Sequence, residues 1–405
     1  MIDLQIWSFP LSIIIAAAFV LFVLLCSKSR TTKYLGWLSS RNFALITIVA
    51  SIVLIAIEGP WSFLLYHNWV FIAVILLLMI PLGVITIVGI RRKTSLYALF
   101  SHAGLLLILF GGFFGAADVT ESQIVVSRQQ SEHLSFTTKG QIVPLPFEIQ
   151  LEDFIIDYYE DGISPKQYTS IITIDGKEMQ TAVNSPCRYD GWDIYQSDYD
   201  PYEMNYSVLK LVRDPWILVV YVGMLLLAIG AVIGMKHTWR SKKVIPFIVV
   251  LTILFTILSL ARINLGHLMP ALRSLWFYPH IIIYMVAYSV LAVASVMGIV
   301  YMKRGKATEI PQKLLTTSSS LLLIGMLCGA VWAKQAWGQY WTWDAKEDWA
   351  AVTWLITVVG AHLPQYRRQL WIAIVIWISF LAMQITWYGV NYLPSSQYSM
   401  HTYNS

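Results

Sequence analysis

Ten long runs of apolar residues limit what this chain can fold into more than any other feature of its sequence. An α-helix needs about 20 apolar residues to cross the hydrocarbon core of a bilayer, and each run is close to that length. Only 13% of the residues are charged, whereas a soluble domain carries about a quarter. The sequence therefore predicts a polytopic α-helical membrane protein with about ten transmembrane helices and excludes a soluble globular enzyme. The predicted spans cover residues 9–27, 42–58, 69–90, 96–116, 214–235, 244–262, 279–301, 314–333, 350–365 and 370–390.

Basic residues lie in every second short loop between these spans. They follow the first, third, fifth, seventh and ninth spans, for example at Arg91, Arg92 and Lys93 after the third. The positive-inside rule places such loops in the cytoplasm. The other short loops carry few basic residues or none, so we expect both termini on the outer side. The large loop at residues 117–213 then also lies outside.

That large loop, between the fourth and fifth spans, contains no long apolar run. Polar and apolar residues alternate within it, as in strands with one buried face, at 147–159, 167–175 and 193–197. Asp-Gly pairs, which are strong hairpin-turn signals, occur at 161–162, 175–176 and 190–191. The sequence predicts a small extracytoplasmic antiparallel β domain inserted between helices 4 and 5.

Cysteine and glycine patterns exclude two classes of chemistry. The three cysteines, Cys26, Cys187 and Cys328, are far apart and form no CxxC motif. The chain is therefore neither a dithiol oxidoreductase nor a carrier of its own thioether-linked haem. No Gly-rich phosphate loop occurs, so ATP is not expected to drive its activity.

Two histidines, His102 and His362, fall inside predicted spans. An ionisable residue within the membrane points to function, because burying it without a partner is costly. Counted along a helix at about 1.5 Å per residue, His102 lies about 13 Å beyond Lys93 and His362 about 8 Å before Arg367. Two imidazoles at similar depth on separate helices can clamp one metal axially. They are equally compatible with helix-packing histidines that hydrogen-bond to neighbours.

Two further histidines, His280 and His401, are predicted at the outer surface. His280 opens the seventh span and His401 follows the last. Surface histidines are most often solvated and without a role. His67 and His267 are also predicted outside, and either can take the place of His280 in a pair of outer histidines.

Six of the 17 tryptophans lie in residues 332–354, which we call the tryptophan segment. Aromatic belts are common at membrane interfaces, but an interfacial anchor accounts for one or two tryptophans at a helix end. A flat platform of indoles offers stacking area to a large planar ring. The carboxylates between them can order the loop, contact Lys334 and Lys346, or meet a ligand. The residues indicate an external site for a planar aromatic ligand, flanked by histidines suited to iron.

The tryptophan segment also carries a resemblance. Residues 337–347, Trp-Gly-Gln-Tyr-Trp-Thr-Trp-Asp-Ala-Lys-Glu, resemble the WWD signature of haem-handling proteins in cytochrome c biogenesis. The continuation with His362, and residues 388–393 before His401, are similar to the CcsA (ResC) branch. Other motifs resemble the CcsB (ResB) family. They lie at residues 101–106 and 111–112 and, in the external loop, at 144–147, 183–186 and 195–197.

The chain thus resembles a CcsB–CcsA fusion, the system II haem exporter and cytochrome c synthetase. The resemblance implies an extra N-terminal helix and inner loop, a CcsB-like region and a CcsA-like region, at residues 1–40, 41–235 and 236–405. It implies haem b as cofactor and the bacterial cytoplasmic membrane as location. It also implies an apocytochrome c with a CxxCH motif and a thioredoxin-like thiol reductant as partners, beside membrane lipid and without nucleic acid.

The resemblance assigns roles to individual residues as well. His102 and His362 match the membrane histidines that bind haem b on its way out. His280 and His401 match the external pair that holds haem axially where it meets the apocytochrome thiols. The same resemblance implies that five residues of the tryptophan segment cradle the porphyrin: Trp337, Trp341, Trp343, Asp344 and Glu347.

Two other functions remain open from the sequence. One is a bis-histidine electron-transfer protein of the cytochrome b kind, which normally has two histidines about a dozen residues apart on one helix. No predicted span has two histidines. The other is a haem-binding transporter or assembly subunit without ligation activity, which the sequence barely separates from a synthetase.

Overall fold

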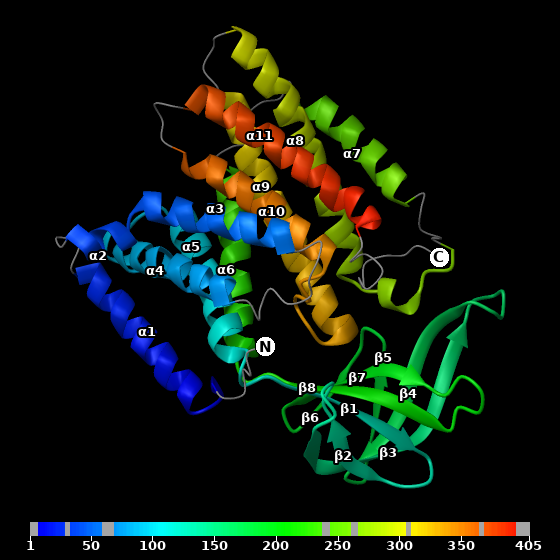
Figure 1. Ribbon diagram of the computed structural model, residues 1–405. Coiled ribbons are helices and arrows are strands. Elements are labelled where there is room, and N and C mark those ends of the chain that lie inside the picture. The colour runs from blue at the N-terminus through cyan, green and yellow to red at the C-terminus, as the bar shows by residue number, and fades with distance from the viewer. Residues whose placement is uncertain are drawn as a thin grey trace.

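The predicted helices and the predicted β domain are both present in the computed structural model, which forms a helical bundle with a β domain at one end (Figure 1). The structure describes residues 7–28, 33–58, 69–236, 244–260, 266–304, 309–363 and 368–393. Each of the ten predicted spans corresponds to a helix, and one short helix, α2 (Lys33–Leu38), was not predicted. The ten are α1 (Leu11–Lys28), α3 (Arg41–Glu58), α4 (Trp69–Arg92), α5 (Leu96–Gly115), α6 (Ile217–Lys236), α7 (Ile245–Leu260), α8 (Phe277–Arg304), α9 (Glu309–Trp337), α10 (Ala345–His362) and α11 (Arg368–Trp387).

Seven of the described helices are long and apolar enough to cross a membrane: α1, α4, α5, α6, α8, α9 and α11. Helices α3 and α7 are apolar but shorter. Helix α10 is less apolar because it begins with acidic residues and lies inside the bundle, against α3, α9 and α11. Its buried hydroxyls pair with those of its neighbours, as Thr353 does with Thr386 at 3.1 Å. The chain is a polytopic membrane protein.

Glycines bring α5 and α6 into backbone contact. A Cβ on Gly104 would lie 2.5 Å from the Leu227 backbone nitrogen, and one on Gly223 would lie 2.9 Å from the Gly104 carbonyl oxygen. Small residues at a helix interface allow this approach in membranes, where packing rather than the hydrophobic effect drives helix association. The contact holds α5, which carries His102, against α6.

The β domain is one antiparallel sheet of eight strands in the order β5-β4-β3-β2-β1-β8-β7-β6. Its core is formed by inward-facing aliphatic and aromatic residues, including Ile149, Ile172 and Leu209. The sheet curls, so that the Thr181 hydroxyl of β5 donates to the Ile194 carbonyl of β7 at 2.7 Å. The strands are β1 (Thr120–Ser127), β2 (Glu132–Phe136), β3 (Ile142–Tyr158), β4 (Pro165–Ile174), β5 (Lys177–Ala182), β6 (Cys187–Tyr189), β7 (Trp192–Tyr199) and β8 (Tyr206–Arg213).

The alternating stretches and turn signals in this region were interpreted correctly. The three predicted strands correspond to β3, β4 and β7. Asp175 and Gly176 both have positive φ (48° and 79°) in the tight β4–β5 turn, which is the backbone that Asp-Gly favours. The other five strands were not predicted.

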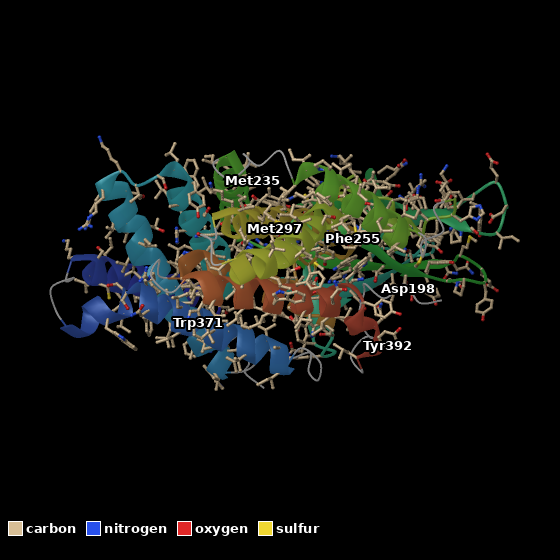
Figure 2. All side chains as sticks on the ribbon, turned by 90° about the horizontal axis from the view of Figure 1, so that it is seen from above. Asp198, Met235, Phe255, Met297, Trp371 and Tyr392 are labelled. Atoms are coloured by element: carbon tan, nitrogen blue, oxygen red, sulfur yellow. The ribbon has the colours of Figure 1, made fainter. Side chains whose placement is uncertain are left out.

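The two ends of α11 lie at different distances from the β domain. In Figure 2, Trp371 near its start is far from Asp198 of β7, whereas Tyr392, just beyond its end, lies on the β-domain side. The chain therefore leaves α11 on the side where the tryptophan segment also lies (Figure 1).

Candidate haem-binding site

The two membrane histidines, predicted on separate helices, lie next to each other. The imidazoles of His102 on α5 and His362 at the end of α10 have ring centroids 6.0 Å apart and planes at 85°. Metal–imidazole bonds are about 2 Å long, so a metal between two opposed imidazoles sets their centroids roughly 6 Å apart. The observed separation therefore fits one metal ion held axially.

Hydrogen bonds fix which ring nitrogen of each histidine carries the proton. Nδ1 of His102 lies 2.6 Å from the Ala98 carbonyl oxygen, and Nδ1 of His362 lies 2.8 Å from the Val358 carbonyl oxygen. A carbonyl only accepts, so both Nδ1 atoms are donors in the neutral rings. The lone pairs are left on both Nε2 atoms, which are the atoms an iron centre binds. A porphyrin supplies the other four ligands, so the pair fits haem.

His280 is half-buried and packs against α9. Its Nδ1 donates to the Gly325 carbonyl at 2.8 Å, and its ring centroid lies 6.0 Å from that of Trp332. A Cβ on Gly329 would lie 2.7 Å from the ring, so this glycine makes room for the imidazole. His280 is therefore a positioned residue next to the tryptophan segment.

The remaining predicted histidines divide into two groups. His401 and His67 lie outside the described residues. His267 faces the β domain, with Nδ1 3.5 Å from Asp161 Oδ2 and its ring centroid 5.0 Å from that of Tyr159. These contacts direct His267 toward the β3–β4 loop.

The tryptophan segment is a helix end, a loop and a helix start. Trp332 is 1% exposed and its Nε1 donates to the Ala271 carbonyl at 2.8 Å. The pair Trp332–Trp337 has centroids 5.3 Å apart at 69°, and the pair Trp341–Trp343 has centroids 6.0 Å apart at 77°. These are edge-to-face contacts. The interpretation of the indoles as one flat platform is wrong for these pairs, because each partner projects from a different point of a turning chain.

One of these tryptophans connects the loop to the first half of the bundle. Trp343 has a left-handed backbone, with φ 59°, and packs edge-on against Phe71 of α4 at 5.1 Å. A bulky residue at positive φ stores strain of about 1–3 kcal/mol, which persists only where surrounding contacts hold it. The contact with Phe71 is one such restraint.

The carboxylates of the segment order the loop, which is one of the three roles left open by the sequence. Asp344 is the N-cap of α10, and its Oδ1 accepts from the backbone nitrogens of Lys346 and Glu347 at 3.0 and 2.9 Å. Glu347 Oε2 accepts from the Thr342 backbone nitrogen and hydroxyl at 2.6 and 3.0 Å. Together they resemble a capping box, with the N-terminal dipole of α10 favouring both negative charges.

Sequence reasoning missed the residues that join this segment to the β domain. Lys334, 4% exposed, contacts Asp193 of β7, and Lys210 of β8 contacts the end of α9. No local sequence pattern predicts contacts between residues that are so far apart in the chain. Asp348, four residues beyond Asp344, is fully buried, and its carboxylate oxygens have no hydrogen-bond partner among the described residues.

Comparisons with known proteins separate the chain into two family regions. Residues 91–205 match the ResB-like family, and residues 212–396 match the cytochrome C assembly protein family. His102 and the β domain up to residue 205 lie in the first match, whereas His280, His362 and the tryptophan segment lie in the second.

Individual relatives agree with the second match. A cytochrome c biogenesis protein CcsA from Chlamydomonas reinhardtii is 31% identical over 154 residues, which are 34% of this chain and 44% of that protein. One from Agrostis stolonifera is 41% identical over 97 residues, 23% of this chain and 29% of that protein. The chain thus spans about half or less of the length of these relatives. With its two family regions in this order, the chain matches the arrangement of a CcsB–CcsA (ResB–ResC) type of fusion protein of cytochrome c biogenesis system II.

Proposed function

We propose that this chain exports haem across the bacterial cytoplasmic membrane and presents it outside for thioether attachment to the CxxCH motif of an apocytochrome c. The opposed pair of His102 and His362, with both Nε2 lone pairs available, is the observation that carries the proposal. The cytochrome c biogenesis proteins that resemble residues 212–396 support the pathway.

In the membrane, His102 and His362 bind the iron of haem b in transit. Two axial imidazoles favour low-spin iron and leave no open position for an oxidant. Because the histidines come from the two family regions, both halves of the fusion are needed to complete this site. The N-terminal helix at residues 1–40 is then an addition to the CcsB-like region (41–235) and the CcsA-like region (236–405).

On the outer side, His280 and His401 ligate the same cargo beside Trp337, Trp341 and Trp343. Asp344 and Glu347 act by holding the loop that carries these indoles. The indole faces and edges orient the porphyrin so that its vinyl groups face outward. Both termini and the β domain lie on this side of the membrane in the proposal.

The ligation step needs little from the protein besides position. Each reduced cysteine thiol adds across one vinyl group, so a carbon–sulfur bond forms and the carbon–carbon double bond becomes single. The thiol proton ends on the terminal vinyl carbon, and no net electrons are transferred. A thioredoxin-like thiol reductant keeps the client cysteines reduced. Proximity and orientation supply most of the acceleration.

A reporter assay tests ligation and separates it from transport alone. The chain is co-expressed with a small CxxCH reporter, or an AxxAH control, in a host without its own maturation system. Covalent haem on the CxxCH reporter only is the expected result. A haem-loaded chain that yields no covalent product would instead indicate a transporter, an assembly subunit without ligation activity, or an electron-transfer cytochrome of the b kind.

A further inference from the structure

The C-terminal end of α9, which lies within the tryptophan segment, packs against the β domain. Gly338 follows the last residue of α9 with φ 87°, and its backbone nitrogen donates to the Lys334 carbonyl at 3.1 Å. This is a helix end closed by a left-handed glycine. A Cβ at this position would lie 3.0 Å from Val212 Cγ2 of β8 and 3.2 Å from Tyr195 Cε2 of β7. A glycine at position 338 therefore allows this turn to pack closely against strands β7 and β8.

Two lysines bind the carbonyl groups that α9 leaves unpaired at this end. Lys334 Nζ donates to the Gly338 carbonyl at 3.1 Å, and Lys210 Nζ of β8 donates to the Trp337 carbonyl at 3.1 Å. Cations at a helix C-terminus are favoured by the helix dipole as well as by these hydrogen bonds. One of the two capping groups comes from the β domain.

The β domain also supplies the counter-charges. Lys334 Nζ lies 3.5 Å from Asp193 Oδ2 and within 5.8 Å of the centre of the Tyr195 ring. Lys210 Nζ lies 3.3 Å from Glu121 Oε2 of β1, and Gln339 Nε2 donates to both oxygens of the same carboxylate at 2.9 Å. Lys334 is almost completely buried, so its charge depends on these partners.

A second carboxyl group, that of Asp214 in the link between β8 and α6, interacts electrostatically with Lys334. Burial raises the pKa of Asp214, and the positive charge of Lys334 opposes that rise. Removal of the lysine charge therefore leaves two acidic groups, Asp193 and Asp214, without their shared cation.

We propose that the β domain is a positioning element of the external site, and that Lys334 and Lys210 hold the tryptophan segment in its bent conformation against strands β1, β7 and β8. This inference rests on the proposed function, in which that segment orients haem. Lys334 and Lys210 act through the loop and do not touch the reacting atoms.

The test uses the full chain with Lys334→Met, Asp193→Asn and the double variant. Lys334→Met alone removes the cation shared by Asp193 and Asp214 and leaves Asp193 only its 3.7 Å contact with Arg188, so we expect covalent haem on the CxxCH reporter to fall about tenfold or more per haem-loaded chain. Hydrogen exchange should rise in residues 338–344 and stay unchanged in strands β3 and β4. Addition of Asp193→Asn should restore part of both, because it removes one of the two acidic charges that Lys334 neutralised.

Controls keep the result interpretable. Arg128→Met removes an exposed ion pair with Asp153 in the same sheet, away from α9, and should leave both measurements at wild-type values. Lys210→Met is the milder second variant if Lys334→Met does not accumulate, and it should also raise exchange in residues 338–344. Wild-type ligation and exchange in both lysine variants would overturn the proposal. If the wild-type chain makes no covalent product, the proposed function fails, and exchange in residues 338–344 still decides whether the lysines hold the loop.

Discussion

The imidazole rings of His102 and His362 lie 6.0 Å apart although they come from different family regions of the chain. His102 is on α5, which glycine packing fixes against α6, and His362 ends α10, which packs against α3, α9 and α11. A shared site at this junction gives a physical reason for the two regions to act as one protein.

Gly104 provides a test of how strictly the α5–α6 contact positions His102. Gly104→Ala should destabilise the protein by about 1–3 kcal/mol, because the added methyl meets backbone atoms of α6 that cannot rotate away. Thermal unfolding in detergent, followed together with bound haem, measures the effect.

Gly112→Ala is the matched control on the same helix, since nothing lies within 4 Å of its Cβ position. It should unfold at or slightly above the wild-type temperature. Equal unfolding temperatures for the two alanine variants would contradict the backbone contact.

The role of Asp344 can be divided between capping and acid chemistry. Asp344→Ala removes an N-cap and should cost about 0.5–2 kcal/mol, with less covalent product on the reporter. Asp344→Asn keeps a capping oxygen, so it should retain most of the product. Loss of product in the asparagine variant at normal protein and haem levels would mean that the carboxylate itself takes part in ligation.

His280 depends on the space left by Gly329. Gly329→Ala should displace the imidazole, break its bond to the Gly325 carbonyl and lower covalent product as His280→Ala does, because a methyl group would lie 2.7 Å from the ring. Haem bound by His102 and His362 should persist in the purified variant.

Gly298→Ala on α8 is the control, because the nearest atoms to its Cβ would lie 3.9 Å away, at an ordinary contact distance. Undiminished ligation by both His280→Ala and Gly329→Ala would remove His280 from the external site.

Cys187 should be an unreactive thiol. Burial raises its pKa to about 11, so about one molecule in 1000 is thiolate at pH 8. Alkylation by iodoacetamide in a Cys26→Ser, Cys328→Ser background should accelerate about tenfold per pH unit up to about pH 11. A rate that levels off near pH 9, as for an ordinary thiol, would show that Cys187 is not shielded by the fold.

The sequence predicted those features that depend on nearby residues. Apolar runs located ten helices, and Asp175-Gly176 located a hairpin because a local backbone requirement selects those residue types. The start of α10 has few apolar residues because this helix is buried among other helices. The sequence around α10 does not show that burial.

The site was predicted in part for the same reason. Depth counting placed His102 and His362 at similar levels, and packing then brought their rings to within 6.0 Å of each other. The orientation of the indoles depends on the left-handed turns at Gly338 and Trp343 and on contacts with Tyr195 and Phe71 from distant elements. Such long-range contacts explain why a flat platform was expected and an edge-to-face arrangement is present.

The absorption spectrum of the purified chain tests whether His102 and His362 bind haem together. We expect a low-spin, bis-imidazole haem b spectrum that is lost in His102→Ala and in His362→Ala and is restored by free imidazole, which refills the position of the missing ring. His133→Ala, at an exposed histidine of the β domain, should leave the spectrum unchanged. A chain purified without haem, or one whose spectrum survives the loss of both His102 and His362, would show that these histidines do not form a haem site.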